Sequence, residues 1–337
     1  MSHILVKRWL AVCCCMVIFM IFLGGLTRLT DAGLSIVEWK PVSGVVPPLG
    51  NADWQDEFAK YQQSVEYKQK NTNMTLSEFK FIFWLEFIHR FAGRVAGLLY
   101  LVPLLYFFVR GRIDTRLLPV YLAISLLFAV QGFMGWYMVK SGLILQPYVS
   151  HFRLACHLVI AVIIYNLLFY QLMKNSFDIL LVERTISLNL AKFFCIFTII
   201  IVYIQIFLGG LVAGLDAGLV YNSFPLMGNS FIPQEIAFKL LSRDSLSDAV
   251  FVQFIHRIGA YIVCTSVGLL VLSLIKTKHP KLNKVAYYIV GVLILQMLAG
   301  IITILYSVPI LMTLVHQIFA IILLSCILWG YFLLKSS

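Results

Sequence analysis

The chain has 337 residues, of which 61% are hydrophobic and only 12% charged, and its formal net charge is +11. A soluble domain usually carries about 25% charged residues, so this composition excludes an ordinary soluble protein and indicates one that resides in the lipid bilayer. The positive charge does not indicate nucleic-acid binding, because no basic run is interleaved with aromatic side chains that stack on bases.

Eight apolar runs are long enough to cross a membrane as helices, since one span needs roughly 20 residues. In chain order they cover about 9–29, 79–109, 116–138, 150–174, 189–213, 249–275, 284–306 and 309–334. The first run has no cleavage site of small residues, so we expect a span there and not a signal peptide. The sequence therefore predicts an all-α membrane protein with eight transmembrane helices.

The short loops after the even-numbered spans, and both chain ends, are rich in Lys and Arg and poor in acidic residues. Because such segments stay in the cytoplasm, we expect both termini there and the long segments 30–78 and 214–248 on the outer side. Each long segment begins with DAGL and contains Pro and aromatic residues. We expect both to form partly ordered caps.

Four pairs of similar segments show that the chain repeats itself. GGLTRLTDAGLS (24–35) matches GGLVAGLDAGLV (209–220), FIHR (87–90) matches FIHR (254–257), Gln131 with Gly135 matches Gln296 with Gly300, and ACHLVIAV (155–162) matches LVHQIFAI (314–321). The matches run in order, which indicates a tandem repeat of four spans. Because four is even, both halves start on the same side, and their pseudo-two-fold axis should lie along the membrane normal. The predicted halves, 1–180 and 181–337, would each be a four-helix bundle, a geometry that holds cofactors between facing helices.

Four histidines related by the repeat lie on the even-numbered spans, one on each: His89, His157, His256 and His316. Each precedes the basic residue that closes its span by a distance of roughly 25 to 32 Å along a helix, close to the full thickness of the hydrocarbon core. All four should therefore lie at one level near the outer face. An ionisable group inside the membrane is costly and by default indicates a function.

Imidazole is an axial ligand of haem iron, and two facing histidines can fill both axial positions. The repeat favours one pair in each bundle, His89 with His157 and His256 with His316. Zinc is less favoured, because its four ligands would have to converge on one point. His151 also begins a span, but Ile310 stands at the matching place, so we do not expect it to be a ligand.

Arginines near these histidines are candidates for binding haem propionates, since guanidinium pairs well with carboxylate. Arg90 and Arg257 directly follow a predicted ligand and are favoured. For Arg94, snorkelling to the lipid surface is an equally open alternative. Arg28 is a weaker candidate, because Val212 or Ala213 occupies its place in the second half.

The halves differ three residues before the first histidine of each, where Glu86 matches Gln253. Positions i and i+3 share a helix face, so residue 86 should lie one turn above His89 toward the outer surface. The sequence shows no partner for this carboxyl, and we expect it to exchange protons; the alternative is a Glu that only hydrogen-bonds a neighbour. The asymmetry predicts a permanent, electron-passing haem in the second half and a haem that undergoes chemistry in the first.

These features resemble the haem A synthase family over essentially the whole chain. The similar segments are GGLTRLTDAGLSIVEWKPVSGVVPPL, FWLEFIHRFAGR, GGLVAGLDAGL and FVQFIHR. Some bacterial members carry a Cys pair in the first outer loop, and residues 30–78 contain no Cys, so the resemblance is to members without that pair (the alphaproteobacterial and mitochondrial-like type). No transit peptide is evident, which favours a bacterial inner membrane over a mitochondrial one.

The resemblance implies oxidation of a pyrrole methyl of haem O to a formyl group, giving haem A for cytochrome oxidase, through two hydroxylations and loss of water. It implies that His256 and His316 ligate the iron of a haem b cofactor. It also implies that His89 and His157 flank the substrate haem, with Glu86 essential nearby. A haem O synthase (a farnesyl transferase) and an electron-transfer protein are expected as partners. Whether the chain forms a homo-oligomer stays open.

Two other functions remain open at this stage. A dihaem b-type electron-transfer protein, such as a quinol oxidoreductase, would share the histidine pairs but would need no substrate haem. A transporter is also built from repeats, but its repeats are more often inverted, with helices broken near the midplane.

Overall fold

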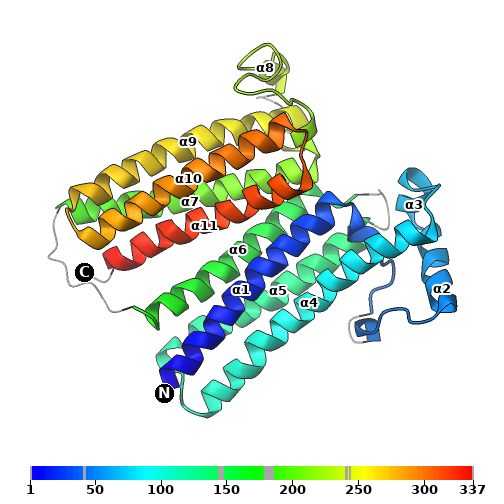
Figure 1. Ribbon diagram of the computed structural model, residues 1–337, viewed down its shortest axis with the longest axis horizontal. Coiled ribbons are helices and arrows are strands. Elements are labelled where there is room, and N and C mark those ends of the chain that lie inside the picture. Colours follow the sequence, from blue (N-terminus) through cyan, green and yellow to red (C-terminus); the bar gives the residue numbers. More distant parts are fainter. Residues whose placement is uncertain are drawn as a thin grey trace. The chain divides into compact units, whose positions relative to one another are not determined.

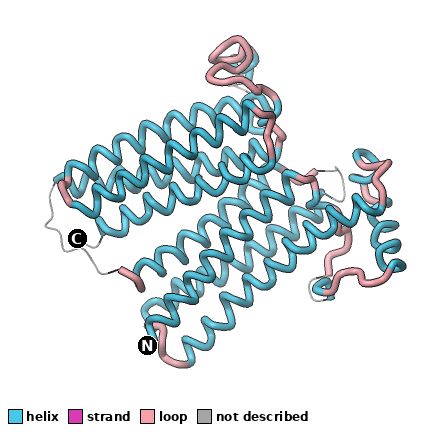
Figure 2. Tube along the Cα trace, in the orientation of Figure 1, coloured by secondary structure: helices cyan, strands magenta, loops and turns pink. Residues whose placement is uncertain are grey.

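The computed structural model describes residues 2–40, 43–142, 148–177, 186–239, 242 and 244–335. Regular structure in these residues is almost entirely helical (Figure 2). Eight helices are long and apolar enough to cross a membrane, and each lies on one of the predicted runs. They are α1 (Ser2–Leu29), α4 (Leu76–Val109), α5 (Leu118–Gly142), α6 (His151–Lys174), α7 (Ile186–Gly214), α9 (Ala249–Lys276), α10 (Pro280–Leu305) and α11 (Ile310–Lys335) (Figure 1). The predicted fold class, an all-α membrane protein with eight spanning helices, is confirmed.

The chain forms two compact units, residues 12–164 in one and residues 165–337 with 3–11 in the other. In the first unit α4 packs against α5 and against the outer cap. In the second unit α7, α9, α10 and α11 pack together as a bundle. The boundary predicted near 180 falls within 178–185, outside the described residues, so the division at that point and the pseudo-two-fold axis stay predictions.

Both helices that carry an FIHR segment begin at a strong N-cap. At α4 the Thr75 hydroxyl accepts from the Glu78 N–H, and the Glu78 carboxylate accepts from the Thr75 N–H, which forms a capping box. At α9 the Asp248 carboxylate accepts from the Phe251 N–H at 2.9 Å. These caps fix where each helix starts, and therefore the direction in which its histidine points.

The matched DAGL segments fold alike in the two units. Asp31 and Asp216 both adopt the left-handed conformation, with φ of 49° and 50°, which Asp tolerates better than most residues. Each is followed by a short 3₁₀ helix, η1 (Ala32–Leu34) or η4 (Ala217–Leu219). The repeat read from the sequence is thus present in the backbone at this turn.

The first outer segment is more ordered than a loop. It contains η2 (Ser43–Val45), α2 (Asn51–Gln62) and α3 (Val65–Lys70), and Figure 1 shows α2 and α3 at one end of α4. Its core joins Trp54 and Tyr61 of the cap to Phe79 and Phe83 of α4, and the Tyr61 and Phe79 rings stack at 5.1 Å. Burial of these large rings attaches the cap to the outer end of the His89 helix. The second outer segment contains η4, α8 (Glu235–Lys239) and η5 (Ser245–Ser247).

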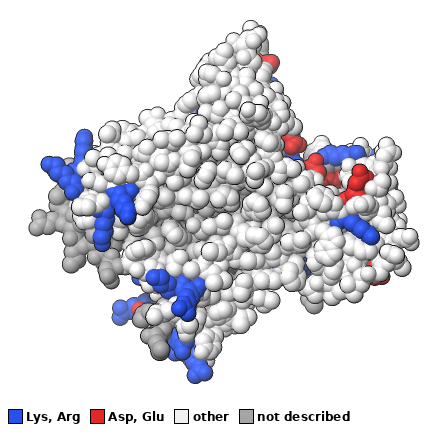
Figure 3. Space-filling model, viewed as in Figure 1, with Lys and Arg blue, Asp and Glu red and all other residues white. Residues whose placement is uncertain are grey.

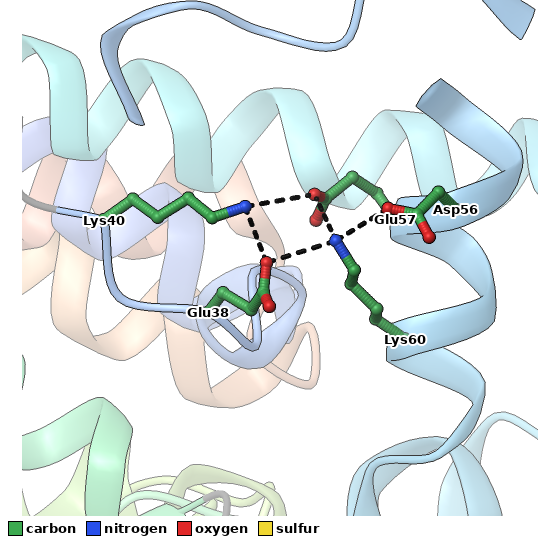
Figure 4. Close-up of polar contacts among 5 residues, drawn as sticks. All are labelled: Glu38, Lys40, Asp56, Glu57 and Lys60. Atoms are coloured by element: carbon green, nitrogen blue, oxygen red, sulfur yellow. Dashed lines mark hydrogen bonds and ion pairs between the residues drawn. The ribbon is translucent and has the colours of Figure 1, made fainter. Parts of the chain in front are cut away.

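Ion pairs attach segment 38–40 to α2 (Figure 4). The Lys60 ammonium lies 2.7 Å from Asp56, 3.1 Å from Glu38 and 3.2 Å from Glu57. Lys40 completes the cluster at 2.6 Å from Glu38. A single exposed pair stabilises little, but charges shared in a network hold a segment better than an isolated pair.

Charge is unevenly distributed along the helices. On the face drawn in Figure 3, basic side chains gather at the helix ends away from the outer segments, and acidic side chains gather near those segments. This distribution follows the excess of Lys and Arg in the even-numbered loops, which predicts that those loops are cytoplasmic. The orientation itself stays a prediction.

Candidate functional site: two histidine pairs

In the first unit the fold brings together His89 on α4 and His157 on α6. They are near enough for a charge on His89 to act on His157. Both side chains are half-buried, while their Nδ1 atoms are fully buried and have no hydrogen-bond partner in the described part of the chain. A buried polar atom without a partner is costly, and its presence is a mark of a site shaped for something other than stability.

In the second unit the fold likewise brings His256 on α9 and His316 on α11 close enough to interact electrostatically. Both side chains are half-buried. Within the described residues no three His, Cys, Asp or Glu side chains are placed to share a metal ion. The pairing of these histidines as ligands of two irons stays a prediction.

A glycine on the preceding span faces each of the four histidine rings. A Cβ added at Gly24 would lie 3.2 Å from Cε1 of His89, and one at Gly209 would lie 3.2 Å from Cε1 of His256. The same contact would be 3.4 Å between Gly135 and His157 and 2.7 Å between Gly300 and His316. Each imidazole therefore lies directly against helix backbone. A side chain at Gly24, Gly209 or Gly300 would crowd its ring, whereas one at Gly135 would meet its ring at an ordinary contact distance.

Three glutamines contact the rings, and sequence reasoning did not assign them to the site. Nε2 of Gln131 lies 3.2 Å from Nε2 of His157, and Nε2 of Gln296 lies 3.4 Å from Nε2 of His316. Nε2 of Gln205 lies 3.1 Å from Nδ1 of His256. The signal was present for two of them: Gln131-Gly135 and Gln296-Gly300 match in the repeat, and an i, i+4 spacing places both on one helix face.

The prediction that Glu86 has no partner is wrong. Its side chain is 2% exposed, and one oxygen accepts from the Ser35 hydroxyl at 2.6 Å and from the Ile36 N–H at 2.7 Å. The other oxygen forms an ion pair with Arg90 at 2.6 Å. The partners come from the turn after η1, which follows the first span directly, and no local pattern in the sequence places that turn against α4.

In the second unit the matching positions form different contacts. The Gln253 amide donates to the Tyr221 carbonyl at 3.0 Å. Arg257 donates to the same carbonyl at 2.8 Å and to the Ser223 carbonyl at 2.8 Å. Backbone carbonyls thus accept from both terminal nitrogens of Arg257, in place of the carboxylate that pairs with Arg90 in the first unit.

The candidate propionate-binding arginines have protein partners at the outer helix ends. Arg90 donates to the Ile36 carbonyl at 3.1 Å besides pairing with Glu86. Arg94 donates to the Lys40 carbonyl at 3.1 Å, and Arg28 pairs with Asp31 at 2.9 Å. Arg90 and Arg94 therefore connect α4 to the first outer segment, and the role of these arginines toward propionates stays a prediction.

Arg90 also lines a groove of about 380 Å³ in the first unit. Trp39 and Trp136 contribute aromatic walls, and Lys140 adds a second cation. The Arg90 guanidinium lies 5.2 Å from the Trp39 ring centre, and the Lys140 ammonium lies 5.0 Å from that of Trp136. The groove combines positive charge with apolar surface, the two features that an amphipathic carboxylate requires.

A second buried carboxyl of the first unit is Glu66 of α3, which is 3% exposed. It accepts from the Tyr61 hydroxyl at 3.1 Å, and that hydroxyl accepts from the Asn71 amide at 2.7 Å. Burial raises the pKa of Glu66 to about 7, and the negative charges of Glu86 and Asp31 also raise it, whereas the Tyr61 bond and the charge of Lys70 lower it.

We expect the cap to become less stable as the pH rises from about 4.5 to about 7. The folded cap holds the Glu66 proton more tightly than the unfolded chain, so its free energy of unfolding is highest below this window and constant above it. Glu66→Gln should abolish this dependence. Hydrogen exchange of the α2 and α3 amides at pH 5 and pH 8, corrected for intrinsic rates, measures it. Stronger protection at pH 8, or an unchanged dependence in the Gln variant, would contradict the assignment.

Several features test whether a haem suits these sites. The histidines stand in pairs, and each ring packs against a glycine. The Nδ1 atoms of His89 and His157 are buried, while all four side chains remain partly accessible. Neutral imidazoles in an apolar, helical surrounding are a donor set for haem iron, and these residues fit that group.

A known family matches most of the chain. The model of the family COX15-CtaA, described as "Cytochrome oxidase assembly protein", matches residues 7–328. The chain belongs to this family. Both histidine pairs and both outer segments lie inside the matched region.

Curated relatives cover the chain completely or nearly so. "Heme A synthase" of Rickettsia bellii (strain RML369-C) is 58% identical over 330 residues, 98% of each chain. The proteins of the same name from Rickettsia felis and Rickettsia conorii are 56% and 55% identical over 337 residues, 100% of each chain. The resemblance inferred from the sequence is confirmed, and the alternative of a dihaem electron-transfer protein receives no support.

Proposed function

We propose that this chain is a haem A synthase that oxidises a pyrrole methyl of haem O to the formyl group of haem A. The observation that carries the proposal is the full-length identity of 55–58% with proteins of that name, on a chain whose fold gathers two histidine pairs. The enzyme is an oxidoreductase, and haem O is its substrate.

The second unit would hold the resident cofactor, a haem b whose iron is ligated by His256 and His316. When bound, this group supplies one-electron transfer. The protein's part is to seat the rings against Gly209 and Gly300 and to close the outer end with Arg257, whose hydrogen bonds fix segment 221–226.

The first unit would bind the substrate haem between His89 and His157. Its methyl must lose protons as it is oxidised, and Glu86 is the carboxylate that lies one helical turn from His89. Ser35, the Ile36 N–H and Arg90 hold Glu86 in place, so it is a positioned base and not a mobile one. Gln253, the matching residue, cannot accept a proton, which fits a unit where no methyl reacts.

The groove beside Arg90 is the natural place for the substrate's carboxylates, since Arg90 and Lys140 both line it. Arg94 and Arg28 lie on the same outer side and would add positive charge there. In the cell the enzyme would sit in the bacterial inner membrane with its termini inside, receiving haem O from the farnesyl transferase that makes it and exchanging electrons with a further partner.

Expression in cells that make haem O but no haem A tests the function. We expect haem A to appear in acid-acetone extracts, identified by its mass, only when this chain is present. Extracts that contain haem O alone, from cells in which the full chain is inserted in the membrane, would contradict the proposed reaction.

A further inference from the structure

The two histidine pairs differ in what contacts Nδ1 of each ring. In the second unit Nδ1 of His316 lies 3.0 Å from the carbonyl oxygen of Gln296, to which it donates as N–H. Nδ1 of His256 lies 3.1 Å from the amide of Gln205. In the first unit the Nδ1 atoms of His89 and His157 are buried, and neither has a hydrogen-bond partner among the described residues.

A pair of substitutions between the repeats accounts for the difference at His256. Gln205 stands four residues before Gly209, and the matching position before Gly24 is Met20. The Gln205 amide occupies the space over Gly259, where an added Cβ would lie only 2.1 Å from its Oε1. The position matching Gly259 is Ala92. The second unit thus has Gln with Gly where the first has Met with Ala.

The difference at His316 follows from how closely its ring approaches the preceding helix, α10. A Cβ at Gly300 would meet Cε1 of His316 at 2.7 Å and Nδ1 at 3.0 Å, whereas a Cβ at Gly135 would meet Cε1 of His157 at 3.4 Å. The closer approach to α10 brings Nδ1 of His316 to the carbonyl one turn below Gly300. The His157 ring lies farther from α5 and does not reach the equivalent oxygen.

A hydrogen bond at Nδ1 has a known effect on a metal-bound histidine. It fixes the tautomer with the proton on Nδ1, leaves Nε2 for the metal and raises the basicity of the ligand. Loss of such a partner typically lowers metal affinity by about 10–100-fold. At His256 the bond is of another kind: the Gln205 amide nitrogen donates to the His256 backbone carbonyl at 2.8 Å and lies against the ring, so it holds the ligand in place.

We propose that the Gln205 bond to the His256 backbone and the Gln296 carbonyl at Nδ1 of His316 make the second-unit pair a retaining iron clamp, and that the unpartnered Nδ1 atoms of the first-unit pair make it a releasing one. The inference rests on the proposed function, because it assumes a haem in each pair. A resident cofactor must stay through many turnovers, whereas a substrate haem must enter and its product must leave. These hydrogen bonds of the second-unit histidines separate the two requirements within one repeated scaffold.

Exchanging the repeat-matched residues between the two units tests the contribution of Gln205. One variant carries Gln205→Met with Gly259→Ala, and the other carries Met20→Gln with Ala92→Gly. The readout is the rate at which purified, haem-loaded protein transfers haem to excess apomyoglobin, with the remaining haem b and haem O identified by mass. We expect about 10–100-fold faster loss of haem b from the first variant and slower loss of haem O from the second.

Alanine substitutions of glycines test the contribution of the hydrogen bond between His316 and the Gln296 carbonyl. Gly300→Ala should push the His316 ring away from the Gln296 carbonyl and speed the loss of haem b. Gly135→Ala meets its ring at an ordinary contact distance and should change haem O loss little. Gly291→Ala lies on the same helix as Gly300 with nothing within 4 Å of its Cβ, so it controls for a general effect of alanine in α10.

The outcomes separate this inference from the proposed function. If the unaltered protein binds no haem, the proposed function fails first. If it binds both haems but releases haem b as fast as haem O, or if Gln205→Met with Gly259→Ala and Gly300→Ala leave haem b loss unchanged, the clamp assignment is wrong while the function stands. A change in the midpoint potential of haem b in these variants, without a change in its release rate, would also overturn the clamp assignment.

Discussion

Glu86→Gln is expected to keep both haem sites but to lower conversion of haem O to haem A by at least about 100-fold, the usual contribution of a positioned proton acceptor. The amide can still accept from Ser35 and Ile36, but it carries no charge for Arg90 and takes up no proton. Haem extracts of the purified variant, analysed by mass, measure both the haem content and the conversion.

A structural effect must be separated from a catalytic one, since breaking a buried ion pair can cost about 3–5 kcal/mol. The second unit already combines Gln253 with Arg257 in a folded site, so the variant recreates a pairing that the scaffold accepts. Glu66→Gln is the matched control, because it neutralises another buried carboxyl of the same unit. Normal haem A production by Glu86→Gln would refute the proposed role.

His256→Ala or His316→Ala is expected to remove nearly all of the low-spin haem b signal, because one axial ligand of the resident haem is lost. His89→Ala should largely retain that signal and instead lose haem O binding. Absorption spectra of the dithionite-reduced proteins, normalised to protein content, measure the difference.

His151→Ala is the matched control, since it removes an imidazole of α6 that no pair uses. A haem b signal that survives both His256→Ala and His316→Ala, and disappears in His89→Ala, would show that the two units have been assigned the wrong way round.

The features that the sequence predicted are those that repeat or that depend on composition. The eight spans follow from runs of apolar residues, and the histidine pairs follow from FIHR and its partner segments, because a membrane helix of known length and start places each residue at a definite depth. Glu86 was found because Gln253 stands at the matching position.

The contacts that the sequence did not predict are between residues with no fixed spacing. Ser35 and Ile36 reach Glu86 only because the left-handed turn at Asp31 folds the chain back over α4. Gln205 was missed for the opposite reason: its repeat partner is Met20, so a search for matched polar residues passes over it. The orderly α2–α3 cap depends on aromatic contacts between Trp54, Tyr61 and α4 that periodicity does not reveal.

Electron paramagnetic resonance of the purified ferric protein, loaded with haem b and haem O, tests the central claim of two separate bis-histidine irons. We expect two low-spin signals of the bis-imidazole type, one abolished by His256→Ala and the other by His89→Ala. A single signal that both substitutions abolish, or signals that neither one changes, would show that the histidines do not ligate two separate irons, one in each unit.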